Sequence, residues 1–250
     1  MGVESLVRHL LFRWSGTAAL LGAARSLNPS RRTGTAYLAA YDDADAMGPM
    51  QRSEALLLHA MVQVTQPRTI VEFGFYLGHS ANVLLKAAPS DTLVASYEID
   101  PAAQRKAQRY FGRRPNHRLF VKSQTDFEPG DVDGRPVNLA FIDASHDFDL
   151  NCACFEKLNP SLADDALIVS HDTGLWHRDV IGPAQQGHVD AGIGTWVDDD
   201  HYAHVVAERR FVDWIQGTYP AFGAVHFHST RVLRHGMSIL QRQRKLANGL

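Results

Sequence analysis

Short apolar runs alternate with helical segments between residues 68 and 172, and this alternation constrains the fold more than any other feature of the chain. The apolar runs indicate buried strands, and the segments between them indicate helices. Strands that alternate with helices of this length form a parallel, doubly wound sheet. The predicted strands are residues 68–74, 92–100, 117–123, 137–143 and 166–172, and the predicted helices between them are residues 79–89, 101–112 and 147–162.

Less regular segments flank this core. Residues 1–26 have a helical pattern, and a second helix is predicted over residues 53–64. Residues 174–200 have no clear period and are rich in Gly, His, Asp and Trp, so a lid or substrate loop is expected there. A helix over residues 204–219 follows. Two further strands, residues 224–230 and 236–243, suggest a hairpin that closes one edge of the sheet.

The pattern predicts two parts of unequal size. Residues 1–50 form an N-terminal helical cap or lid, and residues 51–250 form the main domain, in which residues 174–203 are the substrate loop. A chain of 250 residues can bury a substantial core. The apolar N-terminal helices are suited to a lid or to a dimer interface, so a homodimer is one expected assembly.

Composition excludes several classes of protein. A net charge of −2 argues against a nucleic-acid binder that depends on a basic surface. No apolar run reaches the roughly 18 residues needed to span a bilayer. Cys152 and Cys154 are two positions apart on a predicted helix and face different sides, so we expect free thiols in a reducing cytoplasm. A cytoplasmic protein that binds neither nucleic acid nor membrane is therefore predicted.

The first predicted strand ends in a glycine turn that indicates a nucleotide-type cofactor site. Gly74 permits a sharp turn, and Gly78 permits a ligand to approach the backbone. The dinucleotide fingerprint would need glycine at position 76, which is Tyr76. Glu98 ends the next strand, where an acid can accept hydrogen bonds from ribose hydroxyls. Glu72 and Ser80 flank the turn, although Glu72 can also be a strand-end acid without a ligand.

Two acids end the fourth and fifth predicted strands. Asp143 and Asp172 follow the apolar runs of neighbouring strands. Such strands lie about 4.8 Å apart, so the two carboxylates can converge on one cation. Oxygen-rich sites favour Mg²⁺ or Mn²⁺, and a cation there would bind an acceptor hydroxyl and lower its pKa. Both acids can instead cap the helices that follow them.

Two histidines accompany these acids. His146 lies three residues past Asp143 and is the candidate general base, because an imidazole with an ordinary pKa near 6.5 suits proton removal at neutral pH. A solvent-facing position at the start of a helix is the alternative. His171 precedes Asp172. It can ligate a borderline metal such as Mn²⁺, Fe²⁺ or Zn²⁺, hydrogen-bond the acceptor, or mean that no metal binds.

These motifs resemble those of class I S-adenosylmethionine-dependent methyltransferases, in the small-molecule O-methyltransferase branch. The resemblance covers residues 50–172 and extends more loosely to the C-terminal hairpin. D-x-x-H, ending at His146, is similar to metal-dependent macrolide-sugar O-methyltransferases, where that histidine is the base. At the position of His171, relatives that include cephalosporin-hydroxylase-like proteins usually have a carboxylate. Ser123 and Gln124 match a pair that contacts adenine in catechol O-methyltransferases.

The resemblance implies a Rossmann-like seven-stranded sheet of order 3-2-1-4-5-7-6, with a lid insertion between strands five and six. It implies methylation of a hydroxyl of a small secondary metabolite (a sugar, phenol or polyketide), as in antibiotic biosynthesis. A nicotinamide-dependent oxidoreductase and a non-methylating binding protein are the alternatives. The implied cofactor residues are Glu72, Gly74, Gly78, Ser80, Glu98, Ser123 and Gln124, the metal ligands are Asp143, His171 and Asp172, and the catalytic residues are His146 and Asp143.

Overall fold

The computed structural model describes residues 50, 52–112, 114–177, 197–199, 203–228 and 236–243. The chain divides into two units, residues 1–46 and 47–250, and all described residues belong to the second. The predicted cap of residues 1–50 lies outside the described residues, apart from Met50. So does most of the predicted substrate loop, residues 174–203. The roles assigned to both segments remain predictions.

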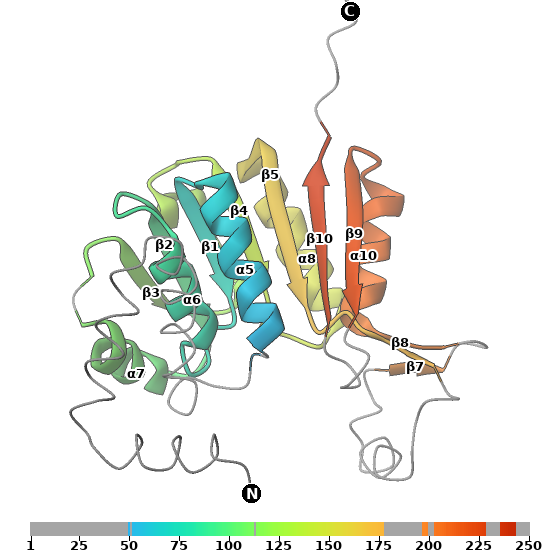
Figure 1. Cartoon of the computed structure of the whole chain (residues 1–250), viewed down its shortest axis with the longest axis horizontal. Coiled ribbons are helices and arrows are strands. Elements are labelled where there is room, and N and C mark those ends of the chain that lie inside the picture. Colours follow the sequence, from blue (N-terminus) through green and yellow to red (C-terminus); the bar gives the residue numbers. More distant parts are fainter. Residues whose placement is uncertain are drawn as a thin grey trace, which may run out of the picture. The chain divides into compact units, whose positions relative to one another are not determined.

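A seven-stranded sheet forms the centre of this unit (Figure 1). Its strands are β1 (Thr69–Phe73), β2 (Leu93–Glu98), β3 (His117–Val121), β4 (Val137–Ile142), β5 (Leu162–His171), β9 (Phe222–His228) and β10 (Gly236–Arg242). Their order across the sheet is β3-β2-β1-β4-β5-β10-β9. The first five strands run parallel, and β10 is antiparallel to both β5 and β9. The predicted order 3-2-1-4-5-7-6 is confirmed.

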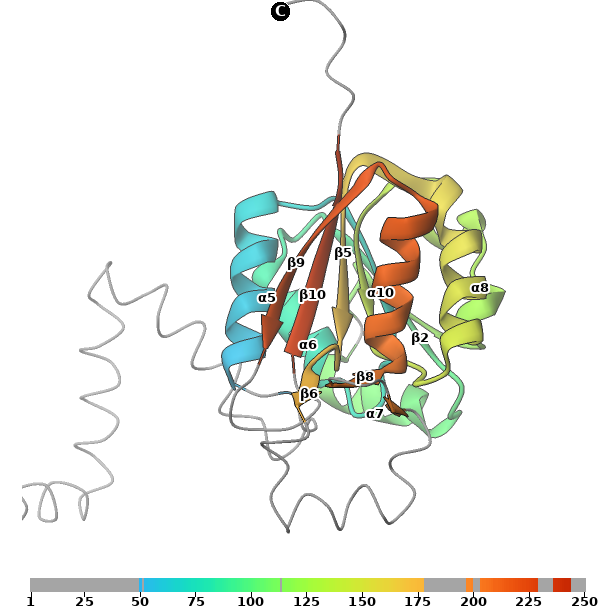
Figure 2. The same cartoon turned by 90° about the vertical axis from the view of Figure 1, so that its right-hand side faces the viewer.

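Helices cover both faces of the sheet. They are α5 (Arg52–Thr65), α6 (His79–Ala87), α7 (Ala102–Phe111), α8 (Phe148–Leu158) and α10 (Ala207–Thr218). Figure 2 shows α5 on one side of the sheet and α8 and α10 on the other. Residues of α6 pack in the same core as residues of α5. None of these described helices has the length and apolar character needed to cross a membrane.

The sheet separates two apolar cores, because successive side chains of a strand point to opposite faces. Ile70 of β1 packs with residues of α5, α6 and α7, whereas its neighbour Val71 packs with residues of α8 and α10. All five residues of β1 are buried. A parallel strand that is covered on both faces usually contains apolar residues nearly throughout. In β1, Glu72 is the charged exception to this rule.

Two predicted helix boundaries are wrong. Residues 204–206 were expected to begin a helix, but they belong to strand β8 (Ala203–Val206). This strand pairs with β6 (Leu175–His177) and β7 (Val197–Asp199) in a small antiparallel sheet. Its adjacent valines have β-branched side chains that favour a strand. The predicted helix over residues 147–162 ends at Leu158, because Pro160 cannot continue it and β5 begins at Leu162.

Candidate active site

Two adjoining cavities lie at the carboxyl ends of β1, β2, β4 and β5. The larger has a volume of about 590 Å³ and the smaller of about 170 Å³. Gly74, Glu98 and Ala144 line both cavities. This is the edge at which open α/β sheets bind their ligands. The larger cavity is lined further by Met50, Phe75, Tyr76, Leu77, His79, Ser80, Asp143, His146, His171 and Asp172.

The glycine turn joins the tips of β1 and β4. Gly74 has φ +101°, and a Cβ atom built there would lie 2.3 Å from the carbonyl oxygen of Asp143. The backbone N–H of Asp143 donates to the carbonyl of Phe73 at 2.9 Å. Glycine is therefore required so that Asp143 can lie directly against the turn. Gly78 has φ +85°, and a Cβ atom there would lie 2.9 Å from the Phe75 ring, so this glycine is needed for packing against Phe75.

Glu72 reaches the cavity through Ser80. Its side chain is fully buried and accepts hydrogen bonds from the hydroxyls of Ser80 and Ser96. Burial raises the pKa of the Glu72 carboxyl from 4.5 to about 7, although these two hydrogen bonds lower it. Ser80 lines the larger cavity. A ligand in the larger cavity would therefore contact Ser80 rather than Glu72.

Glu98 and the Ser123–Gln124 pair meet at the smaller cavity, which all three line. Oε2 of Glu98 accepts a hydrogen bond from the backbone N–H of Tyr76 at 2.7 Å. The amide of Gln124 donates to Asn151 Oδ1 at 2.9 Å, which holds Gln124 against α8. The structure therefore brings the predicted ribose acid and the predicted adenine pair together.

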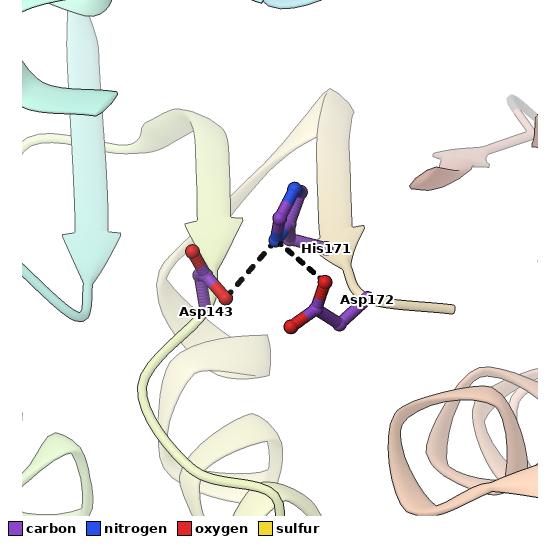
Figure 3. Close-up of side chains that lie close together, drawn as sticks. All are labelled: Asp143, His171 and Asp172. Carbon is purple, nitrogen blue, oxygen red and sulfur yellow. Dashed lines mark hydrogen bonds and ion pairs between the residues drawn. The ribbon is translucent and has the colours of Figure 1, made fainter. Parts of the chain in front are cut away.

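His171 lies among three carboxylates, those of Glu54, Asp143 and Asp172. Its Nδ1 atom is 3.2 Å from Oδ1 of Asp143 and 3.3 Å from Oδ1 of Asp172, and Figure 3 shows the ring between these two acids. Its Nε2 atom is 3.0 Å from Oε2 of Glu54, on α5. Burial disfavours the charged ring, but the nearby carboxylates, Asp143 first, outweigh burial and raise the pKa of His171 well above 6.5.

His146 is held by a different acid. Its Nδ1 atom is in close contact with Oε1 of Glu208, in the first turn of α10. The side chain of Glu208 is 5% exposed, whereas that of His146 is 37% exposed. His146 and Glu208 also lie within ligand distance of Asp172, so Asp172 belongs to two groups that could hold a metal: one with Asp143 and His171, the other with His146 and Glu208.

Comparison with known proteins agrees with this arrangement. Residues 71–173 match a family model described as a methyltransferase domain. The match begins within β1 and ends two residues after β5. This stretch resembles a methyltransferase domain, and the sheet order is that of the Rossmann-like methyltransferase fold. The fold predicted from the motifs is thereby confirmed. No curated protein sequence matches the chain.

Solved structures share the fold of this chain at low sequence identity. The cofactor-bound protein Rv0187 from MTB is 23% identical with a TM-score of 0.58, and the match covers 90% of this chain and 97% of that one. The O-methyltransferase TomG from Streptomyces achromogenes, in complex with SAM, is 19% identical with a TM-score of 0.58, covering 94% and 99%. An O-methyltransferase from Bacillus cereus, in complex with SAH, is 19% identical with a TM-score of 0.58, covering 90% and 97%.

The structure decides between several of the alternatives that the sequence left open for Asp143, His146 and Asp172. Asp143 does not cap α8, because the N-cap of that helix is Asp147, whose side chain accepts from the backbone N–H of Leu150. The next described element after Asp172 is the strand β6, so Asp172 begins no described helix. His146 contacts Glu208 and lines the larger cavity, so its ring is not simply directed to solvent.

Glu54 and Glu208 are the site residues that the sequence analysis missed. Both are buried acids on helices. Glu208 shares the buried face of α10 with Phe211, Val212 and Ile215, which follow it by three, four and seven positions. An acid on the apolar stripe of a helix was the available signal, since such positions normally carry apolar residues.

Proposed function

We propose that the protein is an S-adenosylmethionine-dependent O-methyltransferase that methylates a hydroxyl group of a small secondary metabolite. The observation that carries this proposal is that a cofactor-type turn and a histidine–carboxylate cluster line one cavity. Neighbours of the same fold in complex with SAM and SAH support the choice of methyl donor. A sugar, a phenol or a polyketide hydroxyl is the acceptor we expect, as in antibiotic biosynthesis.

The methyl donor would extend across both cavities. Adenine would lie in the smaller cavity beside Ser123 and Gln124, and the ribose hydroxyls would bind Glu98, which lines both cavities. The methionine part would then enter the larger cavity beside the turn from Gly74 to Ser80. This arrangement would direct the sulfonium methyl group toward the histidines.

His146 would act as the general base. Since Glu208 engages its Nδ1 atom, Nε2 is the atom that we assign to proton removal from the acceptor hydroxyl. The acceptor oxygen attacks the methyl carbon as the carbon–sulfur bond breaks, and the proton passes to His146. S-adenosylhomocysteine and the methyl ether are the products. General base catalysis typically contributes about 10²–10⁴-fold, and positioning can lower the barrier by about 7–11 kcal/mol.

A divalent cation fits the donor atoms of Asp143, His171 and Asp172, which lie within 4.8 Å of one another. When bound, such a cation would polarise the acceptor hydroxyl and lower its pKa. As a ligand of this cation, Asp143 would also help to orient the acceptor oxygen that His146 deprotonates. The carboxylates also supply the negative charge that a dication needs in a partly buried site.

Calorimetry with S-adenosylmethionine tests the proposal most directly. We expect saturable binding of S-adenosylmethionine and S-adenosylhomocysteine, and none of a nicotinamide dinucleotide, which is the cofactor of the alternative oxidoreductase. With a panel of sugar, phenol and polyketide hydroxyls, label from methyl-labelled donor should appear in one class. His146→Ala should lower that transfer by about 10²-fold or more with donor affinity retained. Failure to bind S-adenosylmethionine would refute the proposal.

A further inference from the structure

We propose that the Asp143–His171–Asp172 cluster selects a borderline transition metal ion, of the Zn²⁺, Fe²⁺ or Co²⁺ class, over Mg²⁺, and that Glu54 positions His171 for it. The inference deepens the proposed function, on which it rests, because it names the class of cation for the same site. It also assigns a role to an acid on α5 that the proposed reaction does not use.

The donor set is mixed rather than all oxygen. Nδ1 of His171 lies 3.2 Å and 3.3 Å from carboxylate oxygens of Asp143 and Asp172, so one nitrogen and two oxygens converge on the same point. Mg²⁺ prefers oxygen ligands and keeps several waters. Imidazole nitrogen suits Zn²⁺, Fe²⁺ and related ions. Two carboxylates balance the charge of a dication, so this set favours the nitrogen-accepting metals.

The three ligands are held by strand pairing. Asp143 follows β4 and His171 ends β5, and these strands pair in parallel with Ile142 opposite Ser170. The register therefore brings Asp143 beside His171 without a flexible connection. The ring of Phe141, with its centroid 6.1 Å from that of His171, packs near the imidazole. Ligands on rigid elements keep their geometry better than ligands on loops.

Glu54 determines which nitrogen of His171 faces the acids. Its carboxylate lies 3.0 Å from Nε2, and both side chains are buried, at 8% and 6% exposure. With a cation bound, a carboxylate that accepts the Nε2–H bond holds the ring in the tautomer whose Nδ1 lone pair is directed at the ion, between Asp143 and Asp172. Carboxylate–histidine–metal arrangements use such a contact to orient the ring and make it a stronger ligand.

The second cluster, His146 with Asp172 and Glu208, is less suited to hold the ion. His146 and Glu208 are in close contact with each other, so a cation between them would have to separate the pair. Their contact already has a role, since it orients the base. We therefore expect one tightly bound cation per chain.

Direct metal binding by the full-length chain is the test. Protein stripped with a chelator is titrated with Zn²⁺, Co²⁺ and Mg²⁺ in calorimetry, and the visible absorption of Co²⁺ reports on its ligands. We expect one site with at least 10²-fold higher affinity for Zn²⁺ and Co²⁺ than for Mg²⁺. His171→Glu and His171→Asp replace the nitrogen ligand with an oxygen ligand. They should reduce or reverse the preference for Zn²⁺ and Co²⁺ over Mg²⁺ and change the Co²⁺ spectrum.

A second pair of variants isolates Glu54. Glu54→Gln should weaken Zn²⁺ and Co²⁺ binding by about 10–100-fold, the usual effect of losing an outer hydrogen-bond partner, with Mg²⁺ affinity changed little. Glu156→Gln, the same chemical change at an exposed position of α8, should leave all affinities unchanged. Circular dichroism and S-adenosylmethionine binding show whether each variant is folded.

Three results would overturn the inference. One is equal affinity for Mg²⁺ and Zn²⁺ in the unaltered protein, and another is unchanged metal affinity in Glu54→Gln. The third is the absence of metal binding while S-adenosylmethionine still binds, which would mean that a protonated His171 supplies the positive charge itself. Since donor binding is measured separately, none of these results coincides with failure of the proposed methyltransferase function.

Discussion

Two histidines of the site differ in the acid that holds them and in the nitrogen that is held. Glu54 contacts Nε2 of His171, and Glu208 contacts Nδ1 of His146. An imidazole with one nitrogen engaged presents the other in a defined tautomer. This difference supports separate roles, a ligand for His171 and a base for His146.

Glu208→Gln tests the second role. The amide keeps the size of the side chain but replaces the carboxylate that contacts Nδ1 of His146 and orients the ring. We expect kcat to fall about 10–100-fold, by analogy with outer-sphere carboxylates, while the KM for S-adenosylmethionine changes little. Glu208→Asp should recover part of the loss. A kcat equal to that of the unaltered protein would contradict the assignment.

Glu72 makes stability depend on pH. Its carboxyl has a pKa of about 7 in the folded protein against an ordinary value of 4.5, so the folded state binds the proton more tightly than the unfolded chain. The resulting stabilisation is complete below about pH 4.5 and is lost as the pH rises through 7. The difference in pKa corresponds to on the order of 3 kcal/mol.

Glu72→Gln should remove this dependence, because the amide cannot ionise. Urea unfolding at pH 5 and pH 8, without donor and with a chelator present, measures the change. The difference in unfolding free energy between the two pH values should be smaller in the variant than in the unaltered protein. An identical pH dependence in the two proteins would rule out Glu72 as its source.

At the scale of elements, the close contact between the tips of β1 and β4 shapes the site. Gly74→Ala would force a Cβ atom against the backbone of Asp143 and would also strain a backbone with φ +101°. Gly134 offers a matched control, since it has φ +68° but no atom within 4 Å of the added Cβ. Backbone strain alone costs about 1–2 kcal/mol.

Gly74→Ala should therefore destabilise the fold clearly more than Gly134→Ala does. Chemical denaturation of both variants gives the comparison. Donor binding should also weaken in Gly74→Ala, because the turn lines both cavities, and should be retained in Gly134→Ala. Equal losses of stability in the two variants would mean that the close approach to Asp143 carries no cost.

The same scale shows how far the sequence could predict the structure. Apolar runs that end in polar residues predicted the five parallel strands of the main sheet, because buried parallel strands have a strong and simple pattern. The antiparallel strands β9 and β10 were predicted as a hairpin at the edge of the sheet. Strand β8 was missed, because Val205 and Val206 run directly into α10, so that their short apolar run also fits the start of that helix. The expected adjacency of the fourth and fifth strands predicted that Asp143 and Asp172 meet, with His171 as a candidate further ligand. It could not predict Glu54 or Glu208, whose positions depend on how α5 and α10 pack.

At the scale of the whole unit, the adjoining cavities predict that the methyl donor stabilises the fold. A ligand that binds only the folded state adds about 2.7 kcal/mol at 100 times its Kd. S-adenosylmethionine should therefore raise the thermal midpoint of the unaltered protein. Glu98→Ala should abolish most of the increase, since Glu98 lines both cavities.

Glu156→Ala, at an exposed position of α8, is the matched control and should respond to the donor as the unaltered protein does. Differential scanning calorimetry at several donor concentrations checks both. A full response in Glu98→Ala would exclude this acid from the donor site. It would not affect the assignments of His146 and His171.

The position of Glu208 has a consequence for engineering. This acid lies two residues after the end of β8, whereas Asp172 lies directly after β5, so the two residues bracket the segment that we expect to recognise the acceptor. Chimeras that exchange only the chain between them would leave the base and its partner in place. An exchange that continues into α10 would replace the partner of His146, and a loss of activity in such a chimera would be mistaken for a change in acceptor preference.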